Sequence, residues 1–576
     1  PEPRNAGSRL EAPFFNTLLE TESISAERVK GMTEQSKPRI LLDTHAHDVP
    51  AGTTVMEGLV GAGVLVRTDC GGKGRCGKCL IKPAPGAEAG LSAAGEAERK
   101  ALGPARAESG YRLACCARVT GEVALAIPQE SRVAAEVVQK GLPMLFAALG
   151  PAPAPRPAGY GVAVDVGTTT IAVYLCDLAE RTIVGSTSAR NPQAIFGDDV
   201  ISRIGAVRSE PGMLPRLQRM AVSAIDWAVK ALCRQARVPA GEVAEVVAVG
   251  NSTMVHLLLG ESPASIGVFP YAPLFVEDRL LRAGDIGLAF NPAARLRTLP
   301  LISGYLGADI VSAAIAADLT SRPAGTLLAD VGTNGEIILA SETGLAATSC
   351  ATGPAFEGAA IRHGMQATSG AIDSVRFNPS TRSLDYTVIR RDSGPQRKPS
   401  GICGSGVINA VAELLKAGVV TPSGSYNAGC GSPRLQPGEN NILEFEIAPP
   451  EAAANGRAVT LTQADVRAVQ LAKGALRAGI DLLCRQHGLD RPRRILLAGA
   501  FGSFIDRADA LKIGMFPEMP IEAIEVVGNA AGAGAVLAML DPDRFEQARR
   551  LARTTAVLDL AGHPDFQATF VGALGF

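Results

Sequence analysis

Four cysteines in the first quarter of the chain place the strongest constraint on its fold. Three of them, Cys70, Cys76 and Cys79, lie in a glycine-rich loop, and the fourth, Cys115, returns from a distant segment. Thiolates hold iron–sulfur clusters. Glycine lets the backbone N–H groups of a loop approach inorganic sulfide, because it has no Cβ and accepts positive φ. The C-x₅-C-x₂-C spacing with a distant fourth cysteine therefore predicts a [2Fe–2S] cluster in a small ferredoxin domain.

The same segment allows other interpretations. A structural zinc site also uses cysteines, but it more often contains paired C-x₂-C units. The stretch from Gly72 to Cys79 approaches a phosphate-binding loop, yet Cys79 stands where that motif needs the hydroxyl of Ser or Thr for Mg²⁺. Cys116 directly follows Cys115, and adjacent residues of an extended segment point to opposite sides. The fourth ligand is therefore Cys115 or Cys116, and the preceding Arg-Leu-Ala favours Cys115.

Composition excludes several classes of protein. The 576 residues are too many for one hydrophobic core. The 56 basic and 57 acidic residues balance, so we expect no general attraction to nucleic acid or to an anionic membrane. No apolar run approaches the roughly 18 residues of a membrane span. The remaining cysteines are scattered singly, which is not a disulfide framework and indicates a cytoplasmic location.

The N-terminal part of the chain divides into three segments. Residues 1–38 carry several glutamates and are expected to form a variable tail rather than a targeting peptide. Residues 39–128 fit a β-grasp ferredoxin domain, with Thr53 or Thr54 as the N-cap of its first helix. Residues 129–158 are expected to form a linker, because the proline-rich end of this segment favours an extended, semi-rigid chain.

The rest of the chain contains an internal repeat. An apolar segment runs into Asp165-Val-Gly-Thr and then into a second apolar segment, and the same order recurs around Asp330-Val-Gly-Thr. A repeated strand–turn–strand unit at this separation indicates two homologous halves. We expect residues 159–323 and 324–576 to be two lobes, each a mixed sheet with helices on its faces, in an α/β and α+β multidomain protein.

The two repeated turns have the composition of a phosphate site. Glycine lets backbone N–H groups reach phosphate oxygens, and hydroxyl or amide side chains add donors. The candidate phosphate-binding residues are Gly167, Thr168, Thr169, Gly332, Thr333 and Asn334. A carboxylate beside phosphate requires a cation, so we expect Asp165 to hold Mg²⁺ through water. Asp330 would orient or deprotonate the attacking water, and Glu336 is an alternative base.

A third motif, Ile495-Leu-Leu-Ala-Gly-Ala-Phe-Gly, is a buried-strand pattern that ends in small residues. Adenosine could lie on the backbone of Gly499, Ala500 and Gly502. The three motifs in this order resemble the ATPase superfamily of actin, the sugar kinases and the heat-shock chaperones. This resemblance implies a duplicated ribonuclease H-like fold with ATP bound between the halves.

The full set of motifs resembles the reductive activators of corrinoid proteins. The resemblance rests on the cluster loop, the ATPase turns and the motifs Val249–Met254, Gly353–Gly358 and Gly401–Gly406, and it adds Gly404 and Ser405 as nucleotide contacts. It implies an ATP-hydrolysing activase that transfers one electron from the cluster to Co(II) of a corrinoid protein and so regenerates Co(I) for methyl transfer. It also implies a low-potential electron donor, a corrinoid partner from a methyltransferase system, and a homodimer.

Two other functions fit many of the same residues. An ATP-dependent activator can inject electrons into another enzyme, such as an acyl-CoA reductase or dehydratase. A small-molecule kinase with a redox-sensing cluster would phosphorylate an acceptor, whereas an activator would hydrolyse ATP slowly until its protein partner is present.

Overall fold

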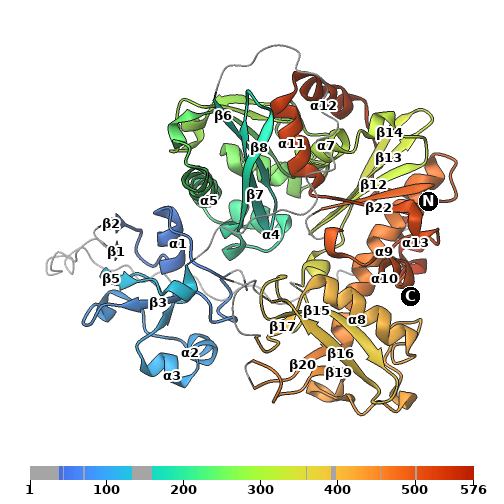
Figure 1. Cartoon of the computed structure of the whole chain (residues 1–576), viewed down its shortest axis with the longest axis horizontal. Helices are drawn as coiled ribbons and strands as arrows, with labels where there is room; N and C mark the ends of the chain where they lie inside the picture. The colour runs from blue at the N-terminus through green and yellow to red at the C-terminus, as the bar shows by residue number, and fades with distance from the viewer. Residues whose placement is uncertain are drawn as a thin grey trace, which may run out of the picture.

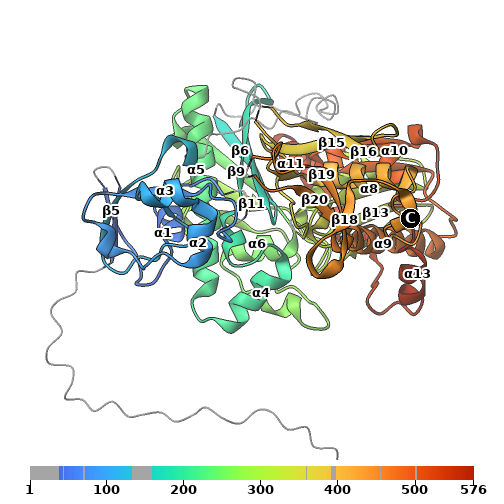
Figure 2. The same cartoon turned by 90° about the horizontal axis from the view of Figure 1, so that it is seen from below.

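The computed structural model describes residues 38–42, 45–68, 70, 72–132, 159–358, 360–390, 397–454, 456–499 and 502–576. They form a ferredoxin module, two lobes with large mixed sheets, and a smaller subdomain on the second lobe (Figure 1). The ferredoxin module lies beside the first lobe, at the end of the molecule away from most of the second lobe (Figure 2). The expected tail, apart from Pro38, and most of the expected linker lie outside the described residues. No helix in the described part is long and apolar enough to cross a membrane.

The ferredoxin module is a five-stranded sheet packed on one helix. Its elements are β1 (Arg39–Leu42), β2 (His45–Asp48), α1 (Val55–Gly61), β3 (Leu80–Pro83), α2 (Glu96–Leu102), α3 (Pro104–Glu108), β4 (Arg112–Leu113) and β5 (Glu122–Ala126), and the strand order is β2-β1-β5-β3-β4. Helix α1 begins after Thr54, whose hydroxyl accepts a hydrogen bond from the Glu57 N–H. The module extends beyond the expected boundary at residue 128, because Leu80 N–H donates to Ser131 and the Ser131 hydroxyl donates to Lys78 O.

The first lobe is built on one six-stranded sheet. Its elements are β6 (Tyr160–Val166), β7 (Thr170–Asp177), β8 (Thr182–Arg190), α4 (Val200–Ser209), α5 (Met213–Ala236), β9 (Val243–Val249), α6 (Ser252–Leu259), β10 (Leu280–Arg282), β11 (Arg295–Thr298) and α7 (Ala308–Ala316). Strands β6, β7 and β8 are antiparallel, and β9 joins the other side of β6 in parallel. The order is therefore β10-β11-β9-β6-β7-β8.

The second lobe repeats this topology. Its elements are β12 (Thr326–Val331), β13 (Gly335–Ser341), β14 (Gly344–Cys350), α9 (Gln463–Gln486), β21 (Arg494–Ala498), α10 (Arg507–Lys512), β22 (Ile524–Gly528), β23 (Ala556–Val557) and α13 (Phe566–Gly572). Strands β12, β13 and β14 are antiparallel, and β21 pairs with β12 in parallel. The expected duplication of a ribonuclease H-like sheet is confirmed, since the order β11-β9-β6-β7-β8 in the first sheet is repeated as β22-β21-β12-β13-β14 in the second.

Two C-terminal helices cross from the second lobe to the first. Helix α11 (Ala530–Leu540) packs on α7, β6 and β9, and α12 (Pro542–Thr554) follows it. One buried apolar cluster contains residues of β6 and β7, of β12 and β13, and of both α7 and α11. The two helices therefore lie between the two lobe sheets, as Figure 1 shows. This packing joins the two lobes, although they are consecutive segments of the chain.

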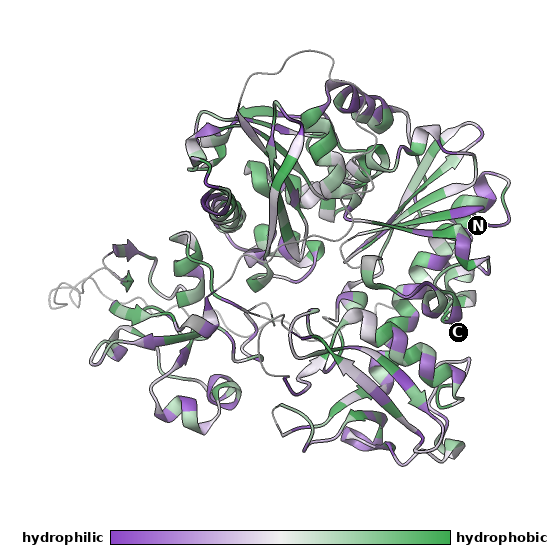
Figure 3. Cartoon of the chain, viewed as in Figure 1, coloured by the Kyte–Doolittle hydropathy of each residue, from purple (hydrophilic) through white to green (hydrophobic). Residues whose placement is uncertain are grey.

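A smaller subdomain is inserted in the second lobe between β14 and α9. It contains β15 (Ala371–Asn378), β16 (Ser383–Val388), β17 (Gly401–Ile402), α8 (Gly404–Lys416), β18 (Leu435–Pro437), β19 (Leu443–Ala448) and β20 (Val459–Thr462), arranged as two three-stranded sheets. Helix α8 covers β15. The strands of both lobe sheets are largely hydrophobic, whereas α5 and α12 carry hydrophilic residues outward (Figure 3).

Candidate cluster and nucleotide sites

The four expected cluster cysteines lie in two pairs. Cys79 precedes β3 and Cys115 follows β4, and the bond from Ala114 N–H to Cys79 O, 2.8 Å long, brings the two segments together. The sulfur atoms of Cys79 and Cys115 are 3.3 Å apart. Cys70 is hydrogen-bonded to Cys76, which lowers the Cys70 pKa to about 4, and the N–H groups of nearby backbone contribute to the shift.

This pairing fits a [2Fe–2S] cluster, in which four cysteines serve two irons. Glycines 72, 74 and 77 all have positive φ, at 85°, 67° and 63°, and a Cβ on Gly77 would lie 2.7 Å from Ala101 O. These glycines therefore allow the loop to close tightly. Among the described residues no three Cys, His, Asp or Glu side chains already converge as metal ligands, so the two pairs would have to draw together around the cluster.

Cys116 also lies near this loop. Its sulfur is 3.7 Å from that of Cys115 and would be 2.9 Å from a Cβ on Gly74. Cys115 is the more buried of the two residues and is the one in contact with Cys79.

The two repeated turns meet where the two lobes touch. Each turn is closed by a backbone hydrogen bond, from Gly167 N–H to Thr170 O and from Gly332 N–H to Asn334 O, both 3.0 Å. The hydroxyl oxygens of Thr169 and Thr333 are 3.4 Å apart. The sequence-predicted turns are thus brought to one place, each at the end of the central hairpin of its lobe.

A carboxylate that the sequence analysis did not single out bridges the two turns. Glu357 accepts a hydrogen bond from the Thr333 hydroxyl at 3.0 Å, through Oε1. Its Oε2 accepts from the Thr169 hydroxyl. Glu357 belongs to the motif Gly353–Gly358, which was quoted for the family resemblance without a role for the glutamate. A carboxylate between two hydroxyl donors occupies the kind of place that phosphate oxygens require.

Two asparagines and an arginine support the first turn. Asn251 Nδ2 donates to the Thr168 hydroxyl at 2.8 Å, and Arg203 Nη2 donates to Thr168 O at 2.6 Å. Asn529, the N-cap of α11, donates to Asp165 Oδ2 at 3.1 Å and to the Tyr174 hydroxyl at 3.0 Å. The motif containing Asn251 was recognisable from the sequence, but nothing local to Asn529 indicated its contact with the first lobe.

Three buried carboxyl groups, those of Asp165, Asp309 and Asp330, lie near these turns. Burial, helped by the charge of Asp309, raises the pKa of Asp165 to about 7. Burial, with the charges of Asp309 and Asp165, raises that of Asp330 to about 8. Burial also raises the pKa of Asp309, at the start of α7, to about 6. These shifts show that burial disfavours the ionised carboxylates, which a bound cation would stabilise.

The other candidate residues lie around these carboxyl groups. Glu336 is buried, and burial followed by the charge of Asp309 raises its pKa; Asn334, expected at the phosphates, is hydrogen-bonded to it. A Cβ on Gly499 would lie 2.7 Å from Asp330 Oδ1, so the end of β21 runs directly past the catalytic candidate. Ala500 lies outside the described residues, and Gly502 follows close to Leu497.

Gly404 and Ser405 form the first turn of α8. This helix packs against the 3-10 turn Pro354–Glu357, which carries the bridging carboxylate. The Ser405 hydroxyl is 3.3 Å from the sulfur of Cys403. The two residues therefore approach the site from the inserted subdomain rather than from either repeated turn.

Comparison with protein families finds three consecutive matches. Residues 42–120 match the 2Fe-2S iron-sulfur cluster binding domain. Residues 160–322 match the RACo middle region, and residues 324–576 match the C-terminal domain of RACo, the ASKHA domain.

Similar proteins agree with these matches. The chain is 33% identical to the corrinoid activation enzyme RamQ of Eubacterium limosum, over 72% of this chain and 69% of that protein. It is 24% identical to the [Co(II) methylated amine-specific corrinoid protein] reductase of Methanosarcina barkeri, over 68% of this chain and 72% of the relative. A solved structure of a reductive activator for a corrinoid, iron-sulfur protein aligns with a TM-score of 0.66 at 27% identity, covering 94% of this chain and 98% of that one.

Proposed function

Because the chain belongs to the RACo family of corrinoid activators, we propose that ATP bound between its two lobes drives one electron from its [2Fe–2S] cluster to the cobalt of a corrinoid protein. The reaction is the reductive activation of Co(II) to Co(I). Membership of this family favours corrinoid activation over the two alternative functions, a small-molecule kinase and an activator of an acyl-CoA enzyme. The observation that carries the ATP-coupled mechanism is the meeting of Thr169, Thr333 and Glu357, since hydroxyl donors of both lobes reach one position.

The cluster would be held by Cys70, Cys76, Cys79 and Cys115. We choose Cys115 over Cys116 because its sulfur contacts that of Cys79 at 3.3 Å. The bound cluster supplies a one-electron carrier. The chain contributes the thiolates and the glycine-rich loop around them, and the low pKa of Cys70 favours the ionised ligand form.

Mg²⁺ would accompany ATP beside the buried carboxyl groups near the two turns. Asp165, Asp309 and Asp330 fit such an ion because their carboxyl groups are buried near one another, and burial raises their pKa values by disfavouring the ionised forms that a cation stabilises. Since they do not converge as direct ligands, contact through water is expected, as is common for Mg²⁺. Bound Mg²⁺ would neutralise charge on the phosphates. Asp330 would then orient the attacking water, and Asn529 would hold Asp165 in place.

Glu357 is proposed to act in the same reaction. The threonine hydroxyls that now donate to its carboxylate are the donors assigned to phosphate. Each hydroxyl has one proton to donate, so phosphate oxygens and Glu357 compete for it. Arrival of ATP would release the carboxylate from Thr169 or Thr333, next to the phosphates, where it can position water. Gly499, Ala500 and Gly502, with Gly404 and Ser405, would surround the adenosine.

The partner is proposed to be the corrinoid protein of a methyltransferase system. The Methanosarcina barkeri relative is named as a reductase of a methylated amine-specific corrinoid protein, which supports this class of partner. A low-potential donor would reload the cluster, in the reducing cytoplasm where free thiols persist. We also propose a homodimer.

Partner-stimulated ATP hydrolysis tests this function. The reconstituted protein should hydrolyse Mg²⁺–ATP slowly alone and faster when a Co(II) corrinoid protein is added. Asp330→Ala should abolish both rates. Transfer of phosphate to a small molecule, or hydrolysis unaffected by every corrinoid protein tested, would contradict the proposal.

A further inference from the structure

One short segment, residues 191–203, contacts both the first phosphate turn and the cluster loop. It connects β8 to α4 and includes the first turn of that helix. The two sites belong to different domains, and most of the expected linker between them lies outside the described residues. Within the described residues, this segment therefore connects the nucleotide turn to the cluster loop.

On the nucleotide side, Asn191 is tied to the turn by two hydrogen bonds. Its backbone N–H donates to Thr169 O at 2.8 Å. Its side-chain Nδ2 donates to Gly167 O at 2.9 Å. Asn191 is fully buried, and its own Oδ1 accepts from the Gln193 N–H. The turn and the start of the segment must therefore move together.

Arg203 fastens the other end of the segment to the same turn. Its guanidinium is fully buried and donates to Thr168 O at 2.6 Å, to Gly197 O at 3.0 Å and to Gln193 Oε1 at 3.1 Å. None of these acceptors is charged. A buried cation with no carboxylate in hydrogen-bond contact is costly, and burial lowers its pKa to about 9, although the charges of Asp199 and Glu357 act in the other direction. Phosphate arriving at the turn would add negative charge near this guanidinium.

On the cluster side, the segment presents Ile195 and Asp198. Ile195 packs against the apolar cores of both the ferredoxin module and the first lobe. A Cβ on Gly72 in the cluster loop would lie 3.0 Å from Ile195 Cγ1 and 3.7 Å from Cys115 Cβ. Asp198 forms an ion pair with Lys73 of the same loop. A shift of the segment would therefore be felt beside two cluster ligands.

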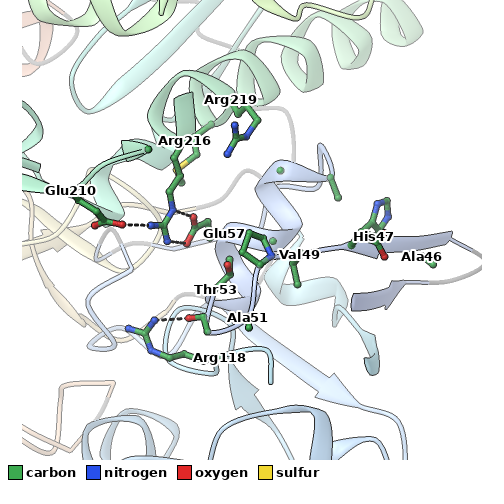
Figure 4. Close-up of a pocket in the computed structure, with 18 of the residues that line it drawn as sticks. Ala46, His47, Val49, Ala51, Thr53, Glu57, Arg118, Glu210, Arg216 and Arg219 are labelled. Atoms are coloured by element: carbon green, nitrogen blue, oxygen red, sulfur yellow. Dashed lines mark hydrogen bonds and ion pairs between the residues drawn. The ribbon is translucent and has the colours of Figure 1, made fainter. Parts of the chain in front are cut away.

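The module has a second contact with the first lobe, and it adjoins the segment, because the guanidinium carbon of Arg216 lies 4.6 Å from the centre of the Phe196 ring. Arg216 of α5 forms an ion pair with Glu57 of α1 and another with Glu210. These residues line an open cleft of about 840 Å³ between the module and α5, shown in Figure 4. None of their hydrogen bonds reaches a phosphate turn. Glu57→Gln removes only the charge that pairs with Arg216 and changes no residue of the segment, so it offers a matched control.

We propose that residues 191–203 couple the nucleotide site to the cluster, so that nucleotide affinity depends on whether the cluster is oxidised or reduced. Asn191 and Arg203 are positioning residues that act through the turn, and Ile195 and Asp198 are their contacts with the cluster loop. Reduction adds one negative charge beside Lys73, which weakens the hold of Asp198 on that lysine. Phosphate bound at the turn attracts the Arg203 cation, which is fastened to the same segment. The inference rests on the proposed nucleotide site.

The dissociation constant of a non-hydrolysable Mg²⁺–ATP analogue measures this coupling directly. It is determined with the full-length, cluster-loaded protein, once oxidised and once reduced by dithionite. Allosteric coupling typically changes affinity about 5- to 150-fold, so the two constants should differ at least about fivefold. In Asp198→Asn and in Ile195→Ala this ratio should fall toward one, while the affinity of the oxidised protein stays within about twofold of wild type.

Glu57→Gln is the matched control, because it breaks the other ion pair between module and lobe. It should retain the wild-type ratio. A ratio that persists in both Asp198→Asn and Ile195→Ala, or that Glu57→Gln abolishes equally, would overturn the inference. Equal affinity in the two redox states of the wild type would overturn it as well and leave the nucleotide site intact. No binding in either state would instead contradict the proposed nucleotide site.

Discussion

The Thr169 hydroxyl lies 3.4 Å from the Thr333 hydroxyl, although 164 residues separate them in the chain. Thr333 directly follows Gly332, whereas Thr169 follows Thr168, the residue after Gly167, so the contact joins the two repeated turns one residue out of register. Glu357 accepts from both hydroxyls and completes the bridge. In this arrangement the lobes touch where ATP is expected to bind, and any ligand there must replace lobe-to-lobe hydrogen bonds.

Replacing the bridging carboxylate should affect hydrolysis more than binding. Glu357→Gln keeps the shape but cannot act as a base, so ATP hydrolysis should fall by about 10²- to 10⁴-fold, the range for a positioned acid or base. Calorimetry should find the affinity for a non-hydrolysable analogue retained or increased, because a negative charge near the phosphates is removed. Glu342→Gln, at an exposed glutamate between β13 and β14, should leave both unchanged. Wild-type turnover in Glu357→Gln would exclude this role.

The cysteine pairing predicts different outcomes for two nearby thiols. Cys76→Ala should lose the visible absorbance and the two irons per chain of a [2Fe–2S] cluster after anaerobic reconstitution. Cys116→Ala should retain both, since Cys115 contacts Cys79. Iron analysis and absorption spectra check this. Loss of the cluster in Cys116→Ala but not in Cys115→Ala would reverse the ligand assignment, and stoichiometric zinc without iron would exclude the cluster.

The buried carboxyl groups near the two repeated turns make the stability of the folded protein depend on pH. Asp330 has its pKa raised from 3.8 to about 8, so the native state binds its proton more tightly than the unfolded chain does. The stability of the nucleotide-free protein should therefore fall as pH rises from about 4 to about 8. Asp330→Asn should flatten this slope, with a higher melting midpoint than wild type at pH 8 and little difference near pH 4. Circular dichroism melts check this, and equal slopes for the two proteins would contradict it.

The helix contact between the lobes tolerates no added side chain. A Cβ on Gly534 of α11 would lie 1.9 Å from Ser312 O of α7, so Gly534→Ala should destabilise the protein by about 1–3 kcal/mol, as overpacking does. Urea unfolding followed by the fluorescence of Trp227 measures this. Gly205→Ala, at an exposed helical glycine with nothing within 4 Å, should instead stabilise by about 0.5–1 kcal/mol. Equal effects of the two changes would contradict the packing account.

Local patterns in the sequence were enough to predict the motif-bearing elements. The Asp-Val-Gly-Thr turns come at the ends of β6 and β12 as expected, because short apolar segments on both sides of a turn are typical of buried strands. Their repetition predicted the two sheets of equal topology. The cap at Thr54 was one of two candidates, and the hydroxyl that reaches the Glu57 N–H decides between them.

Contacts made by distant segments could not be predicted in this way. Asn529 reaches Asp165 only because α11 crosses to the first lobe, and no periodicity near Asn529 encodes that crossing. Glu357 sits in a recognisable motif, but its role depends on two threonines from separate lobes. In the sequence Arg203 looks like an ordinary helical arginine, and only the tertiary structure shows that it is buried and hydrogen-bonded to the phosphate turn.

The formation of Co(I) tests the central claim most directly. Cluster-loaded protein is mixed anaerobically with a Co(II) corrinoid protein and a low-potential reductant, with and without Mg²⁺–ATP, and the visible spectrum is followed. The wild type should produce the Co(I) spectrum only when Mg²⁺–ATP is present, and Cys76→Ala and Asp330→Ala should each fail to produce it. Equal formation of Co(I) without nucleotide, or with either variant, would contradict an ATP-driven electron transfer from this cluster.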